Sequence, residues 1–209
     1  MLNFENLDKF HFPGVGSYDI PPIEPVTDYP AGDFLPISDA MTEKHPEGKN
    51  LHCFVDDYRF ARLWNTPDRY IPILQRFRAV CSPDFSTYTD MPVAMQIYNH
   101  YRKHWCAAYW QLHGLTVYPT ISWSTPDSYS WCFDGEPAGG IVAVSSVGTQ
   151  ADKESKRLFL AGYEEMMKRL DPTWVIFYGR VPVECDWNVI KIPPNYDKIV
   201  ARRKEANKQ

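Results

Sequence analysis

The segment Leu51-His52-Cys53-Phe54-Val55-Asp56-Asp57 decides the fold that the sequence predicts. Its first five residues form a short, mainly apolar run without alternating charged residues, which is typical of a strand buried on both faces of a parallel sheet. The acidic pair ends the run. Similar runs recur along the chain, and the strands they predict begin near residues 51, 79, 115, 141, 174 and 188.

The spacing of these strands indicates a repeated strand–helix unit. The first four steps between strand starts are 26 to 36 residues long, close to the roughly 30 residues of a parallel βαβ unit. Asp90 as cap and Pro92 in the first turn predict the start of a long helix that Gly114 ends after about Leu112. Further helices are expected near residues 59–64, 67–77 and 152–170.

These features predict an α/β protein with a parallel βα-repeat sheet that is barrel-like and incomplete. With a short strand at 34–37 included, six or seven strands are expected, fewer than the eight of a closed barrel. An open doubly wound sheet is the alternative. No glycine-rich phosphate-binding fingerprint follows the first strand, which disfavours a dinucleotide-binding version of that sheet.

The chain is expected to divide into three parts. Seven of the 18 prolines lie in the first 46 residues, so residues 1–49 are interpreted as a proline-rich arm, whose hydrophobic residues pack on the body. Residues 50–197 form a single α/β domain. Residues 198–209 carry five Lys or Arg and one Glu and are interpreted as a solvated basic tail.

Composition excludes several classes of protein. The formal charge is −4, from 22 basic and 26 acidic residues, so a globally cationic surface for nucleic acid is absent. No apolar stretch is long enough to span a membrane, and the first residues do not resemble a secretory signal. The five cysteines form no CxxC pair and fit reduced core residues of a cytoplasmic protein.

The carboxyl ends of the predicted strands are the expected functional site, because these ends meet at one edge of a parallel sheet. Asp56, Asp57 and Asp84 are the candidate catalytic residues, as acid and base or as ligands of Mg²⁺ or Mn²⁺. An alternative interpretation is that such residues cap the following helices. The candidate substrate-binding residues at the other strand ends are Ser122, Trp123, Ser145, Ser146 and Tyr178.

Two further features have a structural and a functional interpretation. Trp123 is a candidate stacking platform for a sugar or a base, although abundant aromatic residues are mostly core. His100 and His104 share a helix face and would form half of a metal site, but Tyr101 stands where a zinc-protease helix has glutamate. A hydrated helix surface is the favoured interpretation of the two histidines.

An ordered series of motifs carries a family resemblance. The motifs are Phe54-Val55-Asp56-Asp57-Tyr58-Arg59-Phe60, Ser82-Pro83-Asp84-Phe85-Ser86, Gln96-Ile97-Tyr98-Asn99 with Trp105, Pro119-Thr120-Ile121-Ser122-Trp123, Cys132-Phe133-Asp134-Gly135, Val144-Ser145-Ser146-Val147-Gly148 and Phe177-Tyr178-Gly179. Over about residues 50–180 the chain resembles a domain-of-unknown-function family of bacteria, bacteriophages and mobile elements. The resemblance implies a phage or mobile-element setting and assigns no catalytic role to any residue.

Three functions remain open from the sequence. The first is a hydrolase of a phosphodiester or glycosidic bond with the acidic site described above. The second is a non-catalytic phage or mobile-element protein that captures a nucleotide, another small molecule or a host protein. The third is an accessory to nucleic-acid processing that uses the basic tail.

Overall fold

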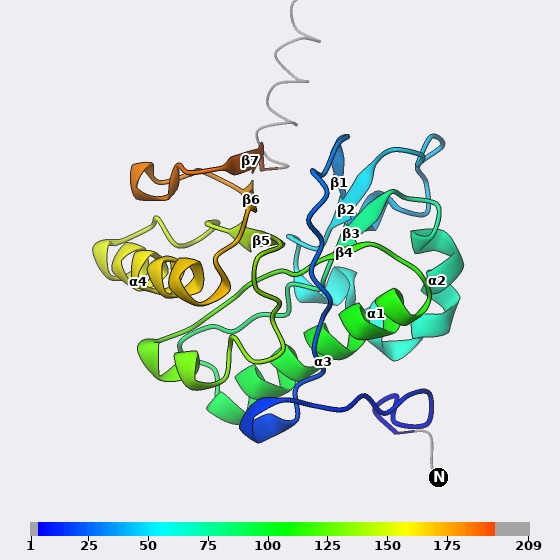
Figure 1. Cartoon of the computed structure of the whole chain (residues 1–209), viewed down its shortest axis with the longest axis horizontal. Coiled ribbons are helices and arrows are strands. Elements are labelled where there is room, and N and C mark those ends of the chain that lie inside the picture. The colour runs from blue at the N-terminus through cyan, green and yellow to red at the C-terminus, as the bar shows by residue number, and fades with distance from the viewer. Residues whose placement is uncertain (1–3, 195–209) are drawn as a thin grey trace, which may run out of the picture.

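The computed structural model describes residues 4–194, and its strands form two open sheets (Figure 1). Their orders are β1-β2-β3-β4 and β5-β6-β7, and every pair is parallel. The strands are β1 Phe34–Pro36, β2 Asn50–His52, β3 Ala79–Cys81, β4 Val117–Tyr118, β5 Ile141–Ser145, β6 Trp174–Tyr178 and β7 Val189–Ile192.

Four α-helices and five short 3-10 turns lie between or beside the strands. The α-helices are α1 Ala61–Asn65, α2 Pro67–Leu74, α3 Val93–Leu112 and α4 Lys153–Leu170. The 3-10 turns are η1 Gly16–Tyr18, η2 Ile37–Asp39, η3 Asp57–Arg59, η4 Pro126–Ser130 and η5 Val183–Cys185. In Figure 1, α1, α2 and α3 lie beside the β1–β4 sheet and α4 lies beside the other sheet.

The predicted α/β class with parallel strands is confirmed, and the sheets are open. A single parallel bridge between Thr120 and Ala143 joins the two sheets next to β4 and β5. Over residues 4–194 no strand pairing joins β7 to β1, so there is no closed barrel. The predicted strand at 115–121 is shorter than expected, because only Val117 and Tyr118 pair as a regular strand.

The inner face of both sheets shares one group of buried side chains. Phe54, which follows β2, stacks on Tyr178 of β6 with ring centroids 5.0 Å apart. The His52 ring of β2 lies 4.9 Å from the same tyrosine ring. Since β2 and β6 belong to different sheets, the sheets face each other across this core.

The two long helices begin in different ways. Asp152 caps α4, since its side chain accepts hydrogen bonds from the N–H groups of Glu154 and Ser155. For α3 the predicted Asp90 cap is wrong: the residue before the helix is Pro92, and no side chain caps it. Gly114 follows the end of α3 with a φ of 78°, a conformation that glycine adopts without strain.

The segment before β1 packs along the body. Trp105 of α3 donates its indole N–H to Phe10 O (3.0 Å). The N–H of Ile23 binds Gly135 O (2.9 Å), and Val26 O accepts from Ile141 at the start of β5 (2.7 Å).

In the described residues no helix has the length and apolarity needed to cross a membrane. All five cysteines are free and buried, as the sequence predicted.

Candidate functional site

The loops that follow β2, β3, β4, β5 and β6 form one rim, because all the strands run in the same direction. Hydrogen bonds connect neighbouring loops of this rim. Thr120 donates its N–H to Ser82 Oγ and its hydroxyl to Ser82 O, both at 2.8 Å. The predicted convergence of strand ends therefore holds, and the candidate residues share the rim.

Asp57 is fixed by the loop after β3. Ser86 donates its N–H to Asp57 Oδ2 (3.1 Å) and its hydroxyl to Oδ1 (2.9 Å). Asn99 of α3 in turn donates to Ser86 O (2.6 Å). Asp56 is different: its side chain is 70% exposed and contacts Arg59 at 3.5 Å. The rim thus holds one oriented carboxylate and one solvated carboxylate next to each other.

Asp84 is a partly buried carboxyl within electrostatic range of Asp57 and of Lys103 on α3. Burial raises the pKa of Asp84 to about 7, while nearby Lys103 opposes this shift and Asp57 adds to it. A carboxylic acid with a pKa near 7 exchanges its proton readily at neutral pH, which is what general acid–base chemistry requires. The next residue, Phe85, packs its ring 3.9 Å below the Arg102 guanidinium and anchors the loop to α3.

Behind Asp84 lies a buried charge network made of Lys103, Glu136 and His104. The Lys103 side chain is 1% exposed, and its ammonium donates to Thr120 O (2.8 Å) and to Glu136 Oε1 (2.6 Å). His104 Nε2 lies 3.0 Å from the same carboxylate oxygen. Burial alone would raise the pKa of Glu136, but Lys103 and His104 outweigh it, and the net shift is downward.

His100 lies next to this network, one helical turn before His104. The two imidazole rings are 4.4 Å apart, and their residues are 1% and 0% exposed. Burial, with Lys103 and His104 adding to it, lowers the pKa of His100 well below its usual value. The interpretation of these histidines as a hydrated helix surface is wrong, because the 131–136 turn and the N-terminal segment cover this face of α3.

Three of the candidate binding residues are used in packing or loop contacts. Trp123 lies against α4, with its ring centroid 5.5 Å from that of Phe159. Tyr178 is 6% exposed and stacks in the inner core. Ser146 is 3% exposed and donates its hydroxyl to Arg180 O (2.7 Å).

The remaining two serines keep more exposure. Ser122 is partly buried beside Trp123, and Ser145 is partly buried at the end of β5, where its Oγ accepts from Val147 N–H (3.2 Å). The rim therefore places both serines, Trp123, Ser146 and Tyr178 at the ends of β4, β5 and β6. Asp57 and Asp84 lie together at the ends of β2 and β3.

Sequence reasoning missed Lys103 and Glu136. The burial of Lys103 could have been inferred from its position. It stands between two histidines on a helix whose next residues are apolar, so the helix has no polar face there. No local signal identifies Glu136, because its partners lie 32 and 33 residues away in the chain. Within residues 4–194, the group of three side chains whose potential ligand atoms lie within 4.8 Å of one another is His100, His104 and Glu136, and the candidate aspartates are not part of it.

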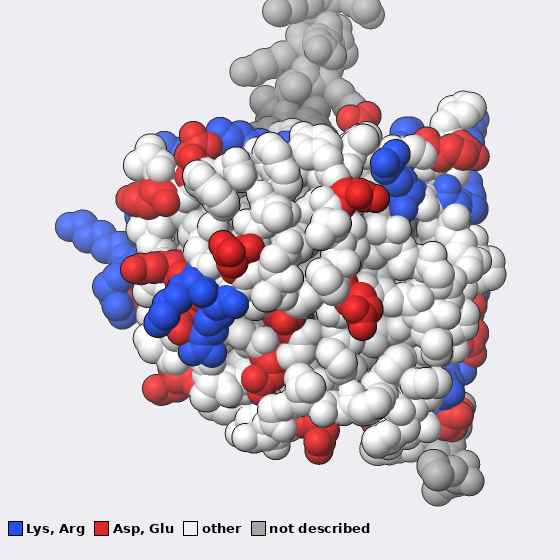
Figure 2. Space-filling view, viewed as in Figure 1, with Lys and Arg blue, Asp and Glu red and all other residues white. Residues whose placement is uncertain are grey.

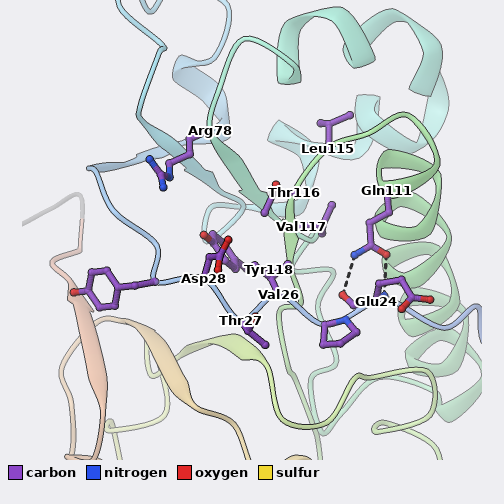
Figure 3. A pocket seen from close by; sticks show the side chains of 12 residues that line it. Glu24, Val26, Thr27, Asp28, Arg78, Gln111, Leu115, Thr116, Val117 and Tyr118 are labelled. Atoms are coloured by element: carbon purple, nitrogen blue, oxygen red, sulfur yellow. Dashed lines mark hydrogen bonds between the residues drawn. The ribbon is translucent and has the colours of Figure 1, made fainter.

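A pocket of about 570 Å³ lies at the opposite end of the strands (Figure 3). Arg78, which precedes β3, lies on one side of it, and Gln111 with Glu24 lies on the other. The Gln111 side chain binds the backbone of Glu24: Nε2 donates to Glu24 O, and Oε1 accepts from Glu24 N–H, both at 2.9 Å. Tyr118 and Asp28 line the pocket between them.

The charged residues on the visible face do not form a continuous basic surface. Figure 2 shows Asp and Glu among uncharged residues across the centre of this face, with Lys and Arg gathered mainly at the left, over α4, and at the upper right. The basic tail predicted at 198–209 lies outside the described residues.

The fold and the rim define an open α/β protein with parallel strands, paired carboxyls at the strand ends and a buried charge network behind them. Within this class the chain belongs to the family described as Domain of unknown function (DUF4417), which matches residues 12–197. The predicted family resemblance is therefore confirmed. The match also extends beyond the expected 50–180 and includes most of the proline-rich arm.

Two relatives come from mycobacteriophages. The chain is 39% identical over 207 residues to "Gene 1 protein" of Mycobacterium phage D29, which covers 95% of this chain and 74% of that protein. It is also 39% identical over 181 residues to "Gene 1 protein" of Mycobacterium phage L5, which covers 85% of this chain and 78% of that protein. No solved structure matches the chain.

Proposed function

We propose that the protein is a hydrolase that cleaves a glycosidic bond at the rim, with Asp84 as the general acid and Asp57 as the second carboxylate. The observation that carries the proposal is that these two carboxyls, at the ends of β2 and β3, lie close enough to interact electrostatically. Burial raises the pKa of Asp84 to about 7, and Asp57 is oriented by two hydrogen bonds from Ser86. Most glycosidases use two such carboxyl groups in different roles.

The choice of a glycosidic bond over a phosphodiester rests on charge. Stabilising the transferring phosphoryl group requires cations or metal ions directed at it. Lys103 is the cation that acts electrostatically on Asp84, but it is buried and already donates to Thr120 O and Glu136. The rings of Tyr58 and Tyr88, which are 73% and 66% exposed beside the two aspartates in the chain, offer faces on which a sugar ring can stack.

Chromogenic substrates test the proposal. A panel of 4-nitrophenyl glycosides is compared with bis(4-nitrophenyl) phosphate, the latter with and without Mg²⁺ or Mn²⁺. We expect turnover of a glycoside, and one apparent pKa in the pH dependence of kcat/KM should lie near 7. The variants Asp84→Asn and Asp57→Asn should each lower kcat/KM by about 100-fold or more, with folding confirmed by circular dichroism.

The matched control is Asp56→Asn, which removes a neighbouring but solvated carboxylate and should leave turnover unchanged. Hydrolysis of the phosphodiester alone would contradict the glycosidic assignment. Full activity of Asp84→Asn, or no turnover of either substrate class, would contradict a hydrolase at the rim.

A second candidate function is capture of a nucleotide or another small molecule in the pocket of Figure 3. Its volume of about 570 Å³ is within the range of small-molecule sites. The Arg78 guanidinium is exposed at its edge for a phosphate, and the Tyr29 ring is nearby for a base. Calorimetric titration with nucleoside monophosphates should show binding that Arg78→Ala weakens about tenfold; no heat of binding contradicts this function.

We also propose that the protein acts in the cytoplasm of a phage-infected cell. The relatives named above are phage proteins, and five buried free thiols suit a reducing compartment. Fractionation of cells that produce the chain should place it with cytoplasmic markers; recovery in a secreted or membrane fraction would contradict this location.

A further inference from the structure

We propose that His100, His104 and Glu136 bind a divalent transition-metal ion of the zinc class inside the protein. The potential ligand atoms of the three side chains all lie within 4.8 Å of one another. Two imidazole nitrogens and a carboxylate oxygen are a ligand set that Zn²⁺ accepts. The site uses different residues from the proposed hydrolase site, so either can fail without the other.

The backbone hydrogen bonds of the two histidines leave one ring nitrogen of each available as a ligand. His100 Nε2 lies 3.0 Å from Asp134 O, so this nitrogen carries the proton, and Nδ1 is left as an acceptor. His104 Nδ1 lies 2.8 Å from Pro21 O, so this nitrogen carries the proton, and Nε2 is left facing Glu136. Metal-binding histidines usually donate their other N–H to a carbonyl or carboxylate in this way.

The cluster contains more acceptors than donors. His100 Nδ1 and Glu136 Oε2 are buried and have no hydrogen-bond partner. Lys103 is the donor that reaches the carboxylate, and it binds Oε1. A single proton would join only two of these acceptors, whereas a metal ion accepts lone pairs from all three side chains. Unpartnered buried acceptors are costly and rare, so their convergence points to a cation.

Charged groups surround the proposed site. Lys103 already supplies one positive charge next to Glu136. Two further acidic groups lie within electrostatic range: the carboxyl of Asp134 interacts with His104, and that of Asp84 interacts with Lys103. The Glu136 carboxylate therefore attracts a cation to the site, and the carboxyl of Asp134, within range of His104, adds to this attraction.

The burial of the site indicates a structural role. The side chains of His104 and Glu136 are 0% exposed, so a substrate cannot reach an ion bound between them. The ligands come from α3 and from the turn at 131–136, and the second hydrogen bond of His104 reaches Pro21 in the N-terminal segment. A bound ion would therefore hold these three segments together.

Metal uptake by the purified full-length chain tests the inference. The protein is stripped with a chelator and then titrated with Zn²⁺ or Co²⁺. We expect a single ion per chain by native mass spectrometry, a visible Co²⁺ absorption band, and a rise in Tm with Zn²⁺. X-ray absorption of the zinc-bound wild-type protein should show nitrogen and oxygen neighbours without sulfur, which excludes the cysteines as ligands.

The variant His100→Gln removes a ligand without breaking the Lys103–Glu136 pair, so it should fold. We expect its Zn²⁺ affinity to fall by more than about 100-fold, since even groups that only support a ligand are worth 10–100-fold, and its Tm should no longer respond to zinc. His113→Gln, at the residue that follows α3 and outside the cluster, should bind as wild type. Failure of the wild-type chain to bind either ion, sulfur in the coordination shell, or unchanged affinity of His100→Gln overturns the inference.

Discussion

Asp84 and Lys103 show how single side chains acquire unusual properties from burial. Each is an ordinary ionisable residue in the sequence, but each loses most of its hydration in the fold. Asp84 responds by holding its proton to about pH 7. Lys103 instead keeps two oxygen partners, Thr120 O and Glu136 Oε1. Unpaired and paired burial therefore have opposite consequences for charge.

The raised pKa of Asp84 predicts a pH-dependent effect of Asp84→Asn on stability. The folded state holds this proton more tightly than the unfolded state, so stability falls as the pH rises from about 4 to about 7 and stays lower above that. We expect Asp84→Asn to stabilise the protein by about 2 kcal/mol at pH 8, allowing for partial exposure, and to have little effect at pH 4. Urea unfolding at both pH values measures this; an equal effect at both would contradict it.

Removing the ammonium of Lys103 should leave Glu136 as a buried charge with only His104 beside it. We expect Lys103→Met to lower the free energy of unfolding by about 3–5 kcal/mol. Lys168→Met is the control, because Lys168 is 76% exposed and its pair with Glu165 is worth at most about 1 kcal/mol. Denaturant unfolding measures the free energy of unfolding of both variants. Similar losses would contradict a larger contribution of the buried pair to stability.

At the scale of elements, α4 approaches the loop after β4 very closely at Gly162. Gly162 of α4 lies against the Trp123 indole, and a Cβ at this glycine would come within 2.1 Å of Trp123 Nε1. Trp123 also packs against Phe159 one turn earlier. The glycine therefore serves the packing of an aromatic side chain, not the backbone conformation of the helix.

Gly162→Ala should destabilise the protein although alanine favours helices. Alanine gains about 1 kcal/mol in an exposed helix, but the clash with Trp123 should reverse this to a net loss of about 1–3 kcal/mol. In a Trp123→Ala background the same substitution should cost little, and a double-mutant cycle of thermal unfolding measures the coupling. A loss of the same size in both backgrounds would contradict the contact as its cause.

On the scale of the whole molecule, the two sheets are held together by little backbone pairing. The parallel bridge of Thr120 with Ala143 supplies hydrogen bonds, and the stacking of Phe54 on Tyr178 supplies side-chain contact. We therefore expect aromatic stacking across the inner core to make the two sheets unfold as one cooperative unit.

Phe54→Ala should weaken both sheets at once. We expect a loss of about 3–5 kcal/mol, with hydrogen exchange accelerated in β2 and β6 together. Tyr58→Ala, which removes a ring that is 73% exposed, should change stability by less than about 0.5 kcal/mol. Two separate unfolding transitions in the wild-type protein, or faster exchange in β2 alone, would contradict the cooperative unit.

Much of the fold is readable from local pattern. The starts of β3, β5 and β6 and the bounds of α4 fall within about one residue of expectation, because burial of short apolar runs and helical periodicity are local properties. Less local features were wrong or missing. Pro92, not the predicted Asp90, precedes the first residue of α3, and β4 is two residues long.

The candidate site also has features that the local sequence predicted and features that it did not. The sequence placed Asp57 and Asp84 at strand ends, and parallel pairing alone brings such ends together. It did not distinguish Asp56, which is solvated, from Asp57, which Ser86 binds. That difference depends on a loop 29 residues further along the chain.

The sequence by itself determined the parallel α/β class, the order of strands and helices, the family and the end of the sheet at which acidic residues gather, because each is encoded in residues near one another in the chain. Only the tertiary structure decided which ionisable groups are buried and with what partners. The His100–His104 pair became interior when the 131–136 turn and the segment around Pro21 covered α3. Dehydration and long-range pairing set the chemistry of these groups, and neither exists until distant segments pack.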